Sequence, residues 1–135
     1  MILVDSSAWV EFDRATGSPV DRVLTDLIGS DGPICVTEPV VMEVCAGARN
    51  DARARDLRRL LERFHLARFD AVADFDAAVT ISRRCRRAGV TPRGLLDCLI
   101  VAVALRCGHE VLAQDRDVAA VAGVVGLGLH PSSRS

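Results

Sequence analysis

The alternation of apolar and polar residues along the chain is typical of an α/β protein. Short apolar runs predict strands at Ile2–Val4, Ile34–Val36 and residues 110–113, and two weaker runs lie at 66–69 and 127–130. Longer segments with helical spacing of apolar residues separate these runs. This order predicts an α/β fold with three layers, α/β/α, around a central, mostly parallel sheet of four or five short strands.

Start and stop signals give the predicted helices their bounds. Ser18 before Pro19 is typical of a helix start, and the apolar spacing continues to Gly29. Thr37 is expected to cap a helix that runs to about Gly47. The other predicted helices span residues 7–12, 51–64, 73–88, 95–107 and 118–122. Together these elements suit a single domain, 1–135, with residues 131–135 as a frayed tail.

Composition excludes several classes of protein. All 17 basic residues are Arg, so a P-loop NTPase and Schiff-base chemistry are excluded, because both need a Lys. The net charge of −1 gives no general argument for a nucleic-acid or membrane partner. No apolar run reaches the roughly 18 residues of a membrane span. The five Cys residues lack C-x-x-C spacing, and we interpret them as small core residues in a reducing cytoplasm.

Four carboxylates stand where the pattern otherwise predicts burial. Asp5 follows the first strand, and Asp115 follows "EVLA" after one residue. Glu43 is the only polar side chain in "PVVMEVCAGA", and Asp97 lies alone in "GLLDCLIVAVAL". Burying an ionised carboxylate costs several kcal/mol unless something compensates it. Four such residues in one small domain indicate a shared compensation.

The predicted fold brings these four carboxylates to one edge of the sheet. The carboxyl ends of parallel strands meet at that edge, where Asp5 and Asp115 are expected. Asp97 lies in the first turn of a helix that starts there, and Glu43 lies about two turns into a helix that also follows a strand. A hard divalent cation, Mg²⁺ or Mn²⁺, takes such oxygen ligands and activates water. The chemistry that fits is phosphodiester hydrolysis.

Each carboxylate also has a simpler interpretation. Asp5 and Asp115 are favoured helix caps, Asp97 is favoured by the helix dipole, and Glu43 could pair with Arg49. Two other functions therefore stay open from the residues alone. One is a DNA-directed or repair-type metal nuclease, and the other is a catalytically silent binding module.

The segments "LVDSSAW", "TEPVVMEV", "LLDCLIVAVA" and "LAQDRD" resemble the PIN-domain ribonucleases, above all the VapC toxins of bacterial toxin–antitoxin pairs. The resemblance implies a cytoplasmic, Mg²⁺- or Mn²⁺-dependent endoribonuclease. It implies catalytic roles for Asp5, Glu43, Asp97 and Asp115, and metal ligation by the three Asp residues together with Asp117.

The same resemblance implies supporting residues and partners. Ser6 or Ser7 would hold the first Asp or a water. Val118 and Gln114 depart from residues common in the family, which puts the role of Asp117 in question. The expected partners are an RNA substrate (tRNA or rRNA), a cognate antitoxin and a second copy of the chain in a homodimer.

Arginines form two clusters on predicted helices. The first, at residues 53–63, contains Asp51, Asp56 and Glu62 within or beside it, which favours a solvated helix face. The second lies at 83–87 near Arg93, and we expect Arg86, Arg87 and Arg93 to contact the substrate backbone. The apolar segment "AVAGVVGLGL", residues 120–129, is expected to belong to the core rather than to an interface.

Overall fold

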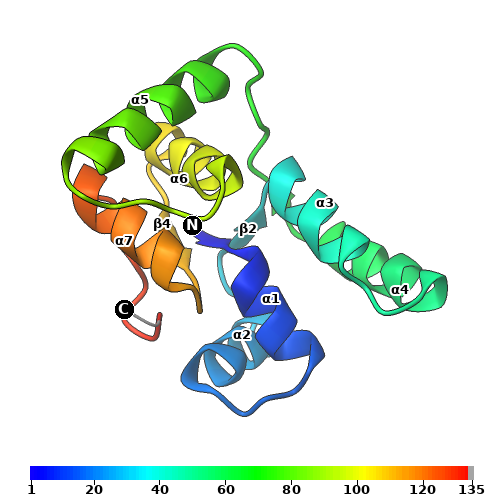
Figure 1. Ribbon diagram of the computed structural model, residues 1–135. Coiled ribbons are helices and arrows are strands. Elements are labelled where there is room, and N and C mark those ends of the chain that lie inside the picture. The colour runs from blue at the N-terminus through cyan, green and yellow to red at the C-terminus, as the bar shows by residue number, and fades with distance from the viewer. Residues whose placement is uncertain (134–135) are drawn as a thin grey trace.

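The fold comes from a computed structural model that describes residues 1–133 (Figure 1). Strands and helices alternate along the chain, as the apolar pattern predicts. The elements in chain order are β1 (Ile2–Val4), α1 (Ser6–Asp13), α2 (Pro19–Gly29), β2 (Ile34–Val36), α3 (Glu38–Ala46), α4 (Asp51–Leu61), β3 (His65–Leu66), α5 (Ala73–Arg87), α6 (Leu95–Cys107), β4 (Glu110–Leu112) and α7 (Arg116–Val125).

The four strands of the described chain form one parallel sheet in the order β3-β2-β1-β4. Ile2 of β1 pairs with Ile34 of β2 on one side and with Glu110 of β4 on the other. The strand order therefore reverses beside β1. In open α/β sheets, ligands bind in the crevice at the carboxyl ends of the strands where such a reversal occurs.

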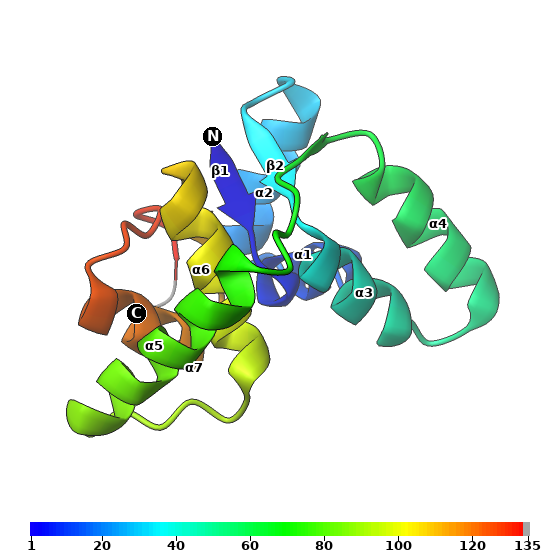
Figure 2. The ribbon, with the colours of Figure 1, turned by 90° about the horizontal axis from the view of Figure 1, so that it is seen from above.

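Helices cover both faces of this sheet, which confirms the predicted three layers. α5, α6 and α7 pack together on one face, and α1 packs with α2 on the other (Figure 2). α3 and α4 pack against each other as a hairpin that extends past the edge of the sheet (Figures 1 and 2).

The core consists mainly of aliphatic side chains from the central strands and α6. β1 and β2 are buried along their whole length, as expected for short strands between two helical layers. Residues 100–104 of α6 are all buried, which explains why this helix is apolar on every side. Trp9 is fully buried and packs against Phe12 and Phe64, with ring centroids 6.0 Å and 5.6 Å away.

An ion pair fixes α6 to the start of α5. The carboxylate of Asp74 is 1% exposed and accepts two hydrogen bonds of 2.9 Å from the Nε and Nη2 atoms of Arg106. Nη2 also donates to the carbonyl of Arg68 at 2.6 Å. The guanidinium holds the pKa of Asp74 below its usual value, although burial acts to raise it. This contact anchors the helix whose opposite end carries Asp97.

The predicted strand at 127–130 is wrong as an element, because only one bridge forms there, between Val111 and Leu129. Gly126 adopts a left-handed φ of 72° to end α7, and Pro131 follows closely. A proline lacks the N–H that a longer ladder needs, so pairing stops after one residue.

Aromatic packing explains two other boundaries that differ from the prediction. α4 ends at Leu61 rather than 64, and Phe64 turns back onto Trp9. The strand expected at 66–69 is His65–Leu66 instead, and Phe69 packs edge-on against Phe75 with centroids 4.9 Å apart.

Capping explains the remaining helix differences. α7 is longer than the predicted 118–122 because Asp115 caps it at Arg116, whereas Gly126 ends it. Thr37 precedes α3 as expected, but its hydroxyl makes no capping hydrogen bond and is buried without a partner among residues 1–133. The position was predicted correctly, and the expected side-chain cap was wrong.

The end of the described chain returns to β4. The Ser133 hydroxyl donates to the carbonyl of Val111 at 3.2 Å and accepts from the N–H of Ala113 at 3.1 Å. Residues 134 and 135 of the expected tail lie outside the described residues. Most apolar side chains of 120–129 belong to the core or pack against it, namely Val121, Ala122, Val124, Val125, Leu127 and Leu129, whereas Ala120 is exposed. Within residues 1–133, no helix has the length and apolar character that crossing a membrane requires.

Candidate metal-binding and catalytic site

The site lies where the strand order reverses, at the carboxyl ends of β1 and β4. Asp5 directly follows β1, and its N–H donates to the carbonyl of Leu112, the last residue of β4, at 2.9 Å. Asp115 lies three residues after Leu112 and caps the start of α7. The two carboxylates thus come from neighbouring strands, as the predicted sheet requires.

Asp5 is held in place by Ser7. The Asp5 carboxylate, 3% exposed, caps α1 by accepting from the main-chain N–H of Ser7 at 3.1 Å and from its hydroxyl at 2.5 Å. The same hydroxyl accepts from the N–H of Gln114 at 2.9 Å. Ser7 therefore links the turn after β1 to the turn after β4. The hydroxyl of Ser6 is buried and has no partner in the described chain.

Three half-buried carboxylates form an acidic triad, Asp97, Asp115 and Asp117. Each offers an oxygen, and these oxygens all lie within 4.8 Å of one another. Asp97 lies in the first turn of α6, and Asp115 caps α7 by accepting from the N–H groups of Asp117 at 2.6 Å and Val118 at 3.4 Å. A set of carboxylate oxygens at this spacing suits a hard divalent cation.

Burial and the repulsion between neighbouring carboxylates raise the pKa of Asp97 and of Asp5. The pKa of Asp97 rises to about 7, first because of burial and then because Asp5, Asp115, Asp117 and Glu43 lie nearby. The pKa of Asp5 rises to about 6 through burial and the charges of Glu43 and Asp115, although the Ser7 hydrogen bonds lower it. A bound cation would relieve this repulsion.

Glu43 completes the acidic surface from α3. It is exposed and lines a cavity of about 270 Å³ together with Arg93, Gly94, Leu96, Asp97 and Asp115. No ion pair joins Glu43 to Arg49 within residues 1–133. The alternative pairing considered from sequence does not form.

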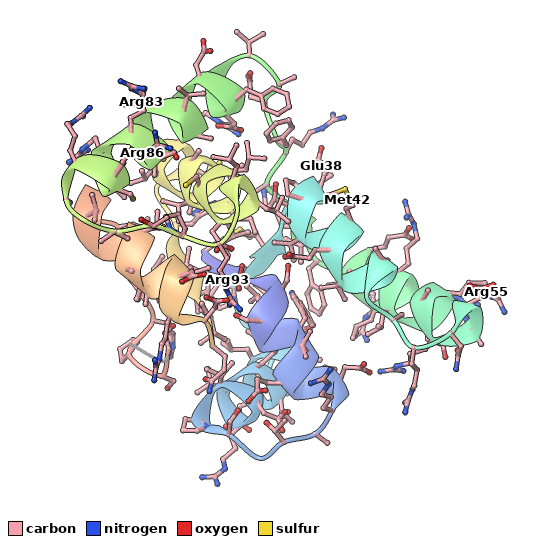
Figure 3. All side chains as sticks on the ribbon, in the orientation of Figure 1. Glu38, Met42, Arg55, Arg83, Arg86 and Arg93 are labelled. Atoms are coloured by element: carbon pink, nitrogen blue, oxygen red, sulfur yellow. The ribbon has the colours of Figure 1, made fainter. Side chains whose placement is uncertain are left out.

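Arg93 contacts the triad directly. Its Nε donates to Oδ2 of Asp117 at 2.8 Å, and its Nη2 lies 3.5 Å from Oδ2 of Asp115. This guanidinium lowers the pKa of Asp117. Arg86 is exposed on α5 and lines a hollow of about 200 Å³ together with Pro92 and Arg93. Figure 3 labels Arg86 and Arg93. Arg87 is exposed at the end of α5.

Two of these contacts were missed by sequence reasoning. The ion pair of Arg93 with Asp117 joins residues 24 positions apart, and no local pattern marks it. Gln114 departs from the residues common in the family, yet its contribution here is a main-chain N–H, which almost any side chain permits. Its departure therefore leaves the link to Ser7 intact.

Residues 2–124 match the family model described as PIN domain. The chain is also 40% identical to Ribonuclease VapC11 of Mycobacterium tuberculosis over 128 residues, which cover 94% of this chain and 96% of that protein. The chain belongs to the PIN-domain family of VapC ribonucleases.

Solved structures of proteins with this PIN-domain fold agree with the architecture. VapBC2 from Rickettsia felis, bound to a DNA fragment from its promoter, superposes with a TM-score of 0.75 at 16% identity, covering 96% of this chain and 98% of that one. A toxin–antitoxin complex from Klebsiella pneumoniae superposes with a TM-score of 0.69 at 17% identity, covering 100% and 97%. At these identities the likeness concerns the fold alone.

Proposed function

We propose that this VapC-family chain is the toxin of a toxin–antitoxin pair and hydrolyses phosphodiester bonds of RNA with Mg²⁺ or Mn²⁺ as cofactor. The observation that carries the proposal is the convergence of five acids where the strand order reverses. Asp5, Glu43, Asp97, Asp115 and Asp117 come from four separate parts of the chain, since Asp115 and Asp117 both lie at the start of α7. The 40% identity to a ribonuclease over nearly the whole chain supports the substrate class.

Within this proposal, the triad holds the cation through its carboxylate oxygens, and Asp5 adds negative charge from the buried side. When bound, the cation supplies positive charge to the phosphate and lowers the pKa of a coordinated water. Glu43, exposed on the cavity wall, can accept a proton from the attacking water. In this proposal, Arg93 and the exposed Arg86 and Arg87 would bind phosphates of the RNA backbone.

The function is tested by replacing Asp97 with Asn, which keeps the shape and removes one charge. Loss of residues that merely orient metal ligands costs roughly 10–100-fold in activity, so loss of a triad acid is expected to cost more than about 100-fold. The measurement is the initial rate of RNA cleavage with and without Mg²⁺ or Mn²⁺. The variant should fold, since it relieves like-charge repulsion at a half-buried site.

A matched control is Asp26→Asn, which removes the same charge from an exposed position on α2. Its cleavage rate should equal that of the wild type. Undiminished cleavage by Asp97→Asn, or cleavage that survives removal of all divalent ions, would contradict the proposed mechanism.

The partners follow from the same proposal. A cognate antitoxin is expected, and the groove of about 570 Å³ between α3 and α4 offers an apolar surface of the kind that marks interaction sites. The groove is lined by Val41, Met42, Leu61, Phe64 and Leu66, among other residues. We further propose a homodimer in the cytoplasm, where the five free Cys residues stay reduced.

The target and partner can be identified together. The chain is expressed alone and together with a candidate antitoxin, a small gene encoded beside it, and the 5′ ends of cellular RNA are mapped. We expect new ends in tRNA or rRNA that disappear when the small gene is coexpressed and its product copurifies. Cuts that persist in the presence of that product would count against it as the antitoxin.

A further inference from the structure

The guanidinium of Arg93 uses carboxylate oxygens that a cation in the acidic triad would need. Its Nε lies 2.8 Å from Oδ2 of Asp117, and its main-chain N–H donates to the same oxygen at 3.2 Å. Its Nη2 lies 3.5 Å from Oδ2 of Asp115. Two of the three triad acids are thus partly neutralised by a residue of the same chain.

The contact of Arg93 with Asp117 and Asp115 is one that a competing cation can replace. The Arg93 side chain is 83% exposed, and it lies in the loop between α5 and α6 beside Pro92 and Gly94. Exposed ion pairs contribute little to stability, so a competing cation can replace them. Arg106 is a useful contrast, because it bonds a carboxylate that is 1% exposed and also the carbonyl of Arg68.

We propose that Arg93 is an internal counter-ion that competes with the divalent cation for Asp117 and Asp115. It weakens metal binding in the free protein until the cation displaces the guanidinium from these oxygens. This inference rests on the proposed function, since it assumes that the triad binds Mg²⁺ or Mn²⁺.

The displaced side chain has a second partner nearby. Arg93 lines the same cavity as Glu43 and Asp97, where the phosphate to be cut would lie. A phosphate that binds the guanidinium frees Asp117 for the cation, and the cation in turn frees Arg93 for the phosphate. By linkage, each ligand then strengthens the binding of the other.

The test is a calorimetric titration of the full chain with Mn²⁺ alone, without RNA. Arg93→Gln removes the competing charge, and we expect Mn²⁺ to bind about three- to fivefold more tightly than in the wild type. Arg86→Gln is the matched control, because Arg86 is an exposed cation in the adjoining hollow and has no contact with the triad in the described chain. Its Mn²⁺ affinity should stay within about twofold of the wild type.

A second readout follows the side chain itself. In ¹H–¹⁵N spectra, the Nε–H resonance of Arg93, assigned by its loss in Arg93→Gln, should shift when Mg²⁺ is added. Unchanged or weaker Mn²⁺ binding in Arg93→Gln would overturn the inference and leave the proposed function standing, provided that the wild type binds Mn²⁺. Equal tightening in Arg86→Gln would overturn it too, because distant charge alone would then explain the effect. If neither the wild type nor Arg93→Gln binds Mn²⁺, both the inference and the proposed cofactor fail.

Discussion

The two serines that follow Asp5 differ in what their hydroxyls contact. Ser7 donates to Asp5 and accepts from the N–H of Gln114 at 2.9 Å, so it joins the ends of two neighbouring strands. The Ser6 hydroxyl is buried without a partner in the described residues. Successive residues of a helix point about 100° apart, so only one of the two can face the strand ends. Ser7 is therefore the positioning residue.

We expect Ser7→Ala to lower the rate of RNA cleavage by about 10–100-fold, as is typical when a residue that orients a metal-site acid is removed. Asp5 would keep the main-chain N–H of Ser7 but lose the hydroxyl. The rate is measured under saturating Mn²⁺, together with the melting temperature. Ser6→Ala serves as the control and should cleave at the wild-type rate, because no hydrogen bond is lost. Equal losses in both variants would show that the serines act through packing alone.

The acids of the site could be predicted from the sequence, whereas their contacts could not. Asp97 and Glu43 stand out because each is the only charge in an apolar stretch where burial is expected, although Glu43 is in fact exposed. The ion pair of Arg93 with Asp117 depends on how the loop before α6 meets the first turn of α7, and no periodic pattern encodes that contact. Which of Ser6 and Ser7 faces the strand ends depends on the rotation of α1 about its axis. Two adjacent serines in a sequence do not specify that rotation.

α6 connects the stability of the fold to the position of the site. Its first turn carries Asp97, and its last turn carries Arg106, which forms an ion pair with the buried carboxylate of Asp74 on α5. Residues 100–104 between them are completely buried. A shift of this helix along its axis would break the ion pair and move Asp97 relative to Asp115. The ion pair thus helps to fix the geometry of the triad.

Arg106→Leu should lower the free energy of unfolding by about 2–4 kcal/mol, because it leaves the Asp74 carboxylate buried without its cation. The loss is smaller than for a fully buried pair because the Arg106 side chain is 37% exposed and partly screened by water. Urea unfolding at neutral pH measures the change. Arg58→Leu is the control, since its pair with Glu62 is exposed and should contribute about 0.5 kcal/mol or less. Similar losses in both variants would refute the special role of Arg106.

Local signals predicted the elements better than their ends. α2 and α6 match the prediction because Ser18, Pro19 and Gly108 are strong boundary residues. α4 and the last predicted strand do not match, because tertiary contacts of Phe64 and the turn at Gly126 override the local apolar pattern. Boundaries set by distant contacts are beyond what a local pattern can encode.

Across the whole molecule, the near-neutral net charge does not reveal that acids and arginines are concentrated in different places. Acids gather where the strand order reverses, and exposed arginines gather on α5. The metal-free protein keeps the acids together at the cost of a raised pKa for Asp5 and Asp97. Its stability should therefore depend on pH and on divalent cations.

The free energy of unfolding of the metal-free protein should decrease as pH rises from 5 to 8. Asp5 and Asp97 have pKa values of about 6 and about 7 in the folded protein and near 3.8 when unfolded. Between these values the folded chain holds more protons than the unfolded chain, so added protons favour folding. Urea unfolding in the presence of a chelator at several pH values measures this.

The control for this pH dependence is Asp97→Asn, which removes one titrating group. The free energy of unfolding of this variant should fall less steeply over the same pH range. His109, whose pKa is lowered, acts in the opposite direction, but it is present in both proteins. Its contribution therefore cancels when the variant's curve is subtracted from that of the wild type. Saturating Mn²⁺ should also flatten the wild-type curve, because a bound cation keeps the acids ionised. Parallel curves for the wild type and Asp97→Asn would mean that Asp97 does not carry this effect.

The five acids are spread along the chain from residue 5 to residue 117, and this order has a consequence during translation. When a ribosome has made the first hundred residues, Asp5, Glu43 and Asp97 exist, but β4 and the two remaining acids do not. Asp5 then lacks the neighbouring strand whose carbonyl accepts from its N–H. A nascent chain therefore cannot assemble the site before residue 117 has left the ribosome. For an enzyme that cuts RNA, we therefore expect the nascent chain to be inactive toward its own messenger until that point.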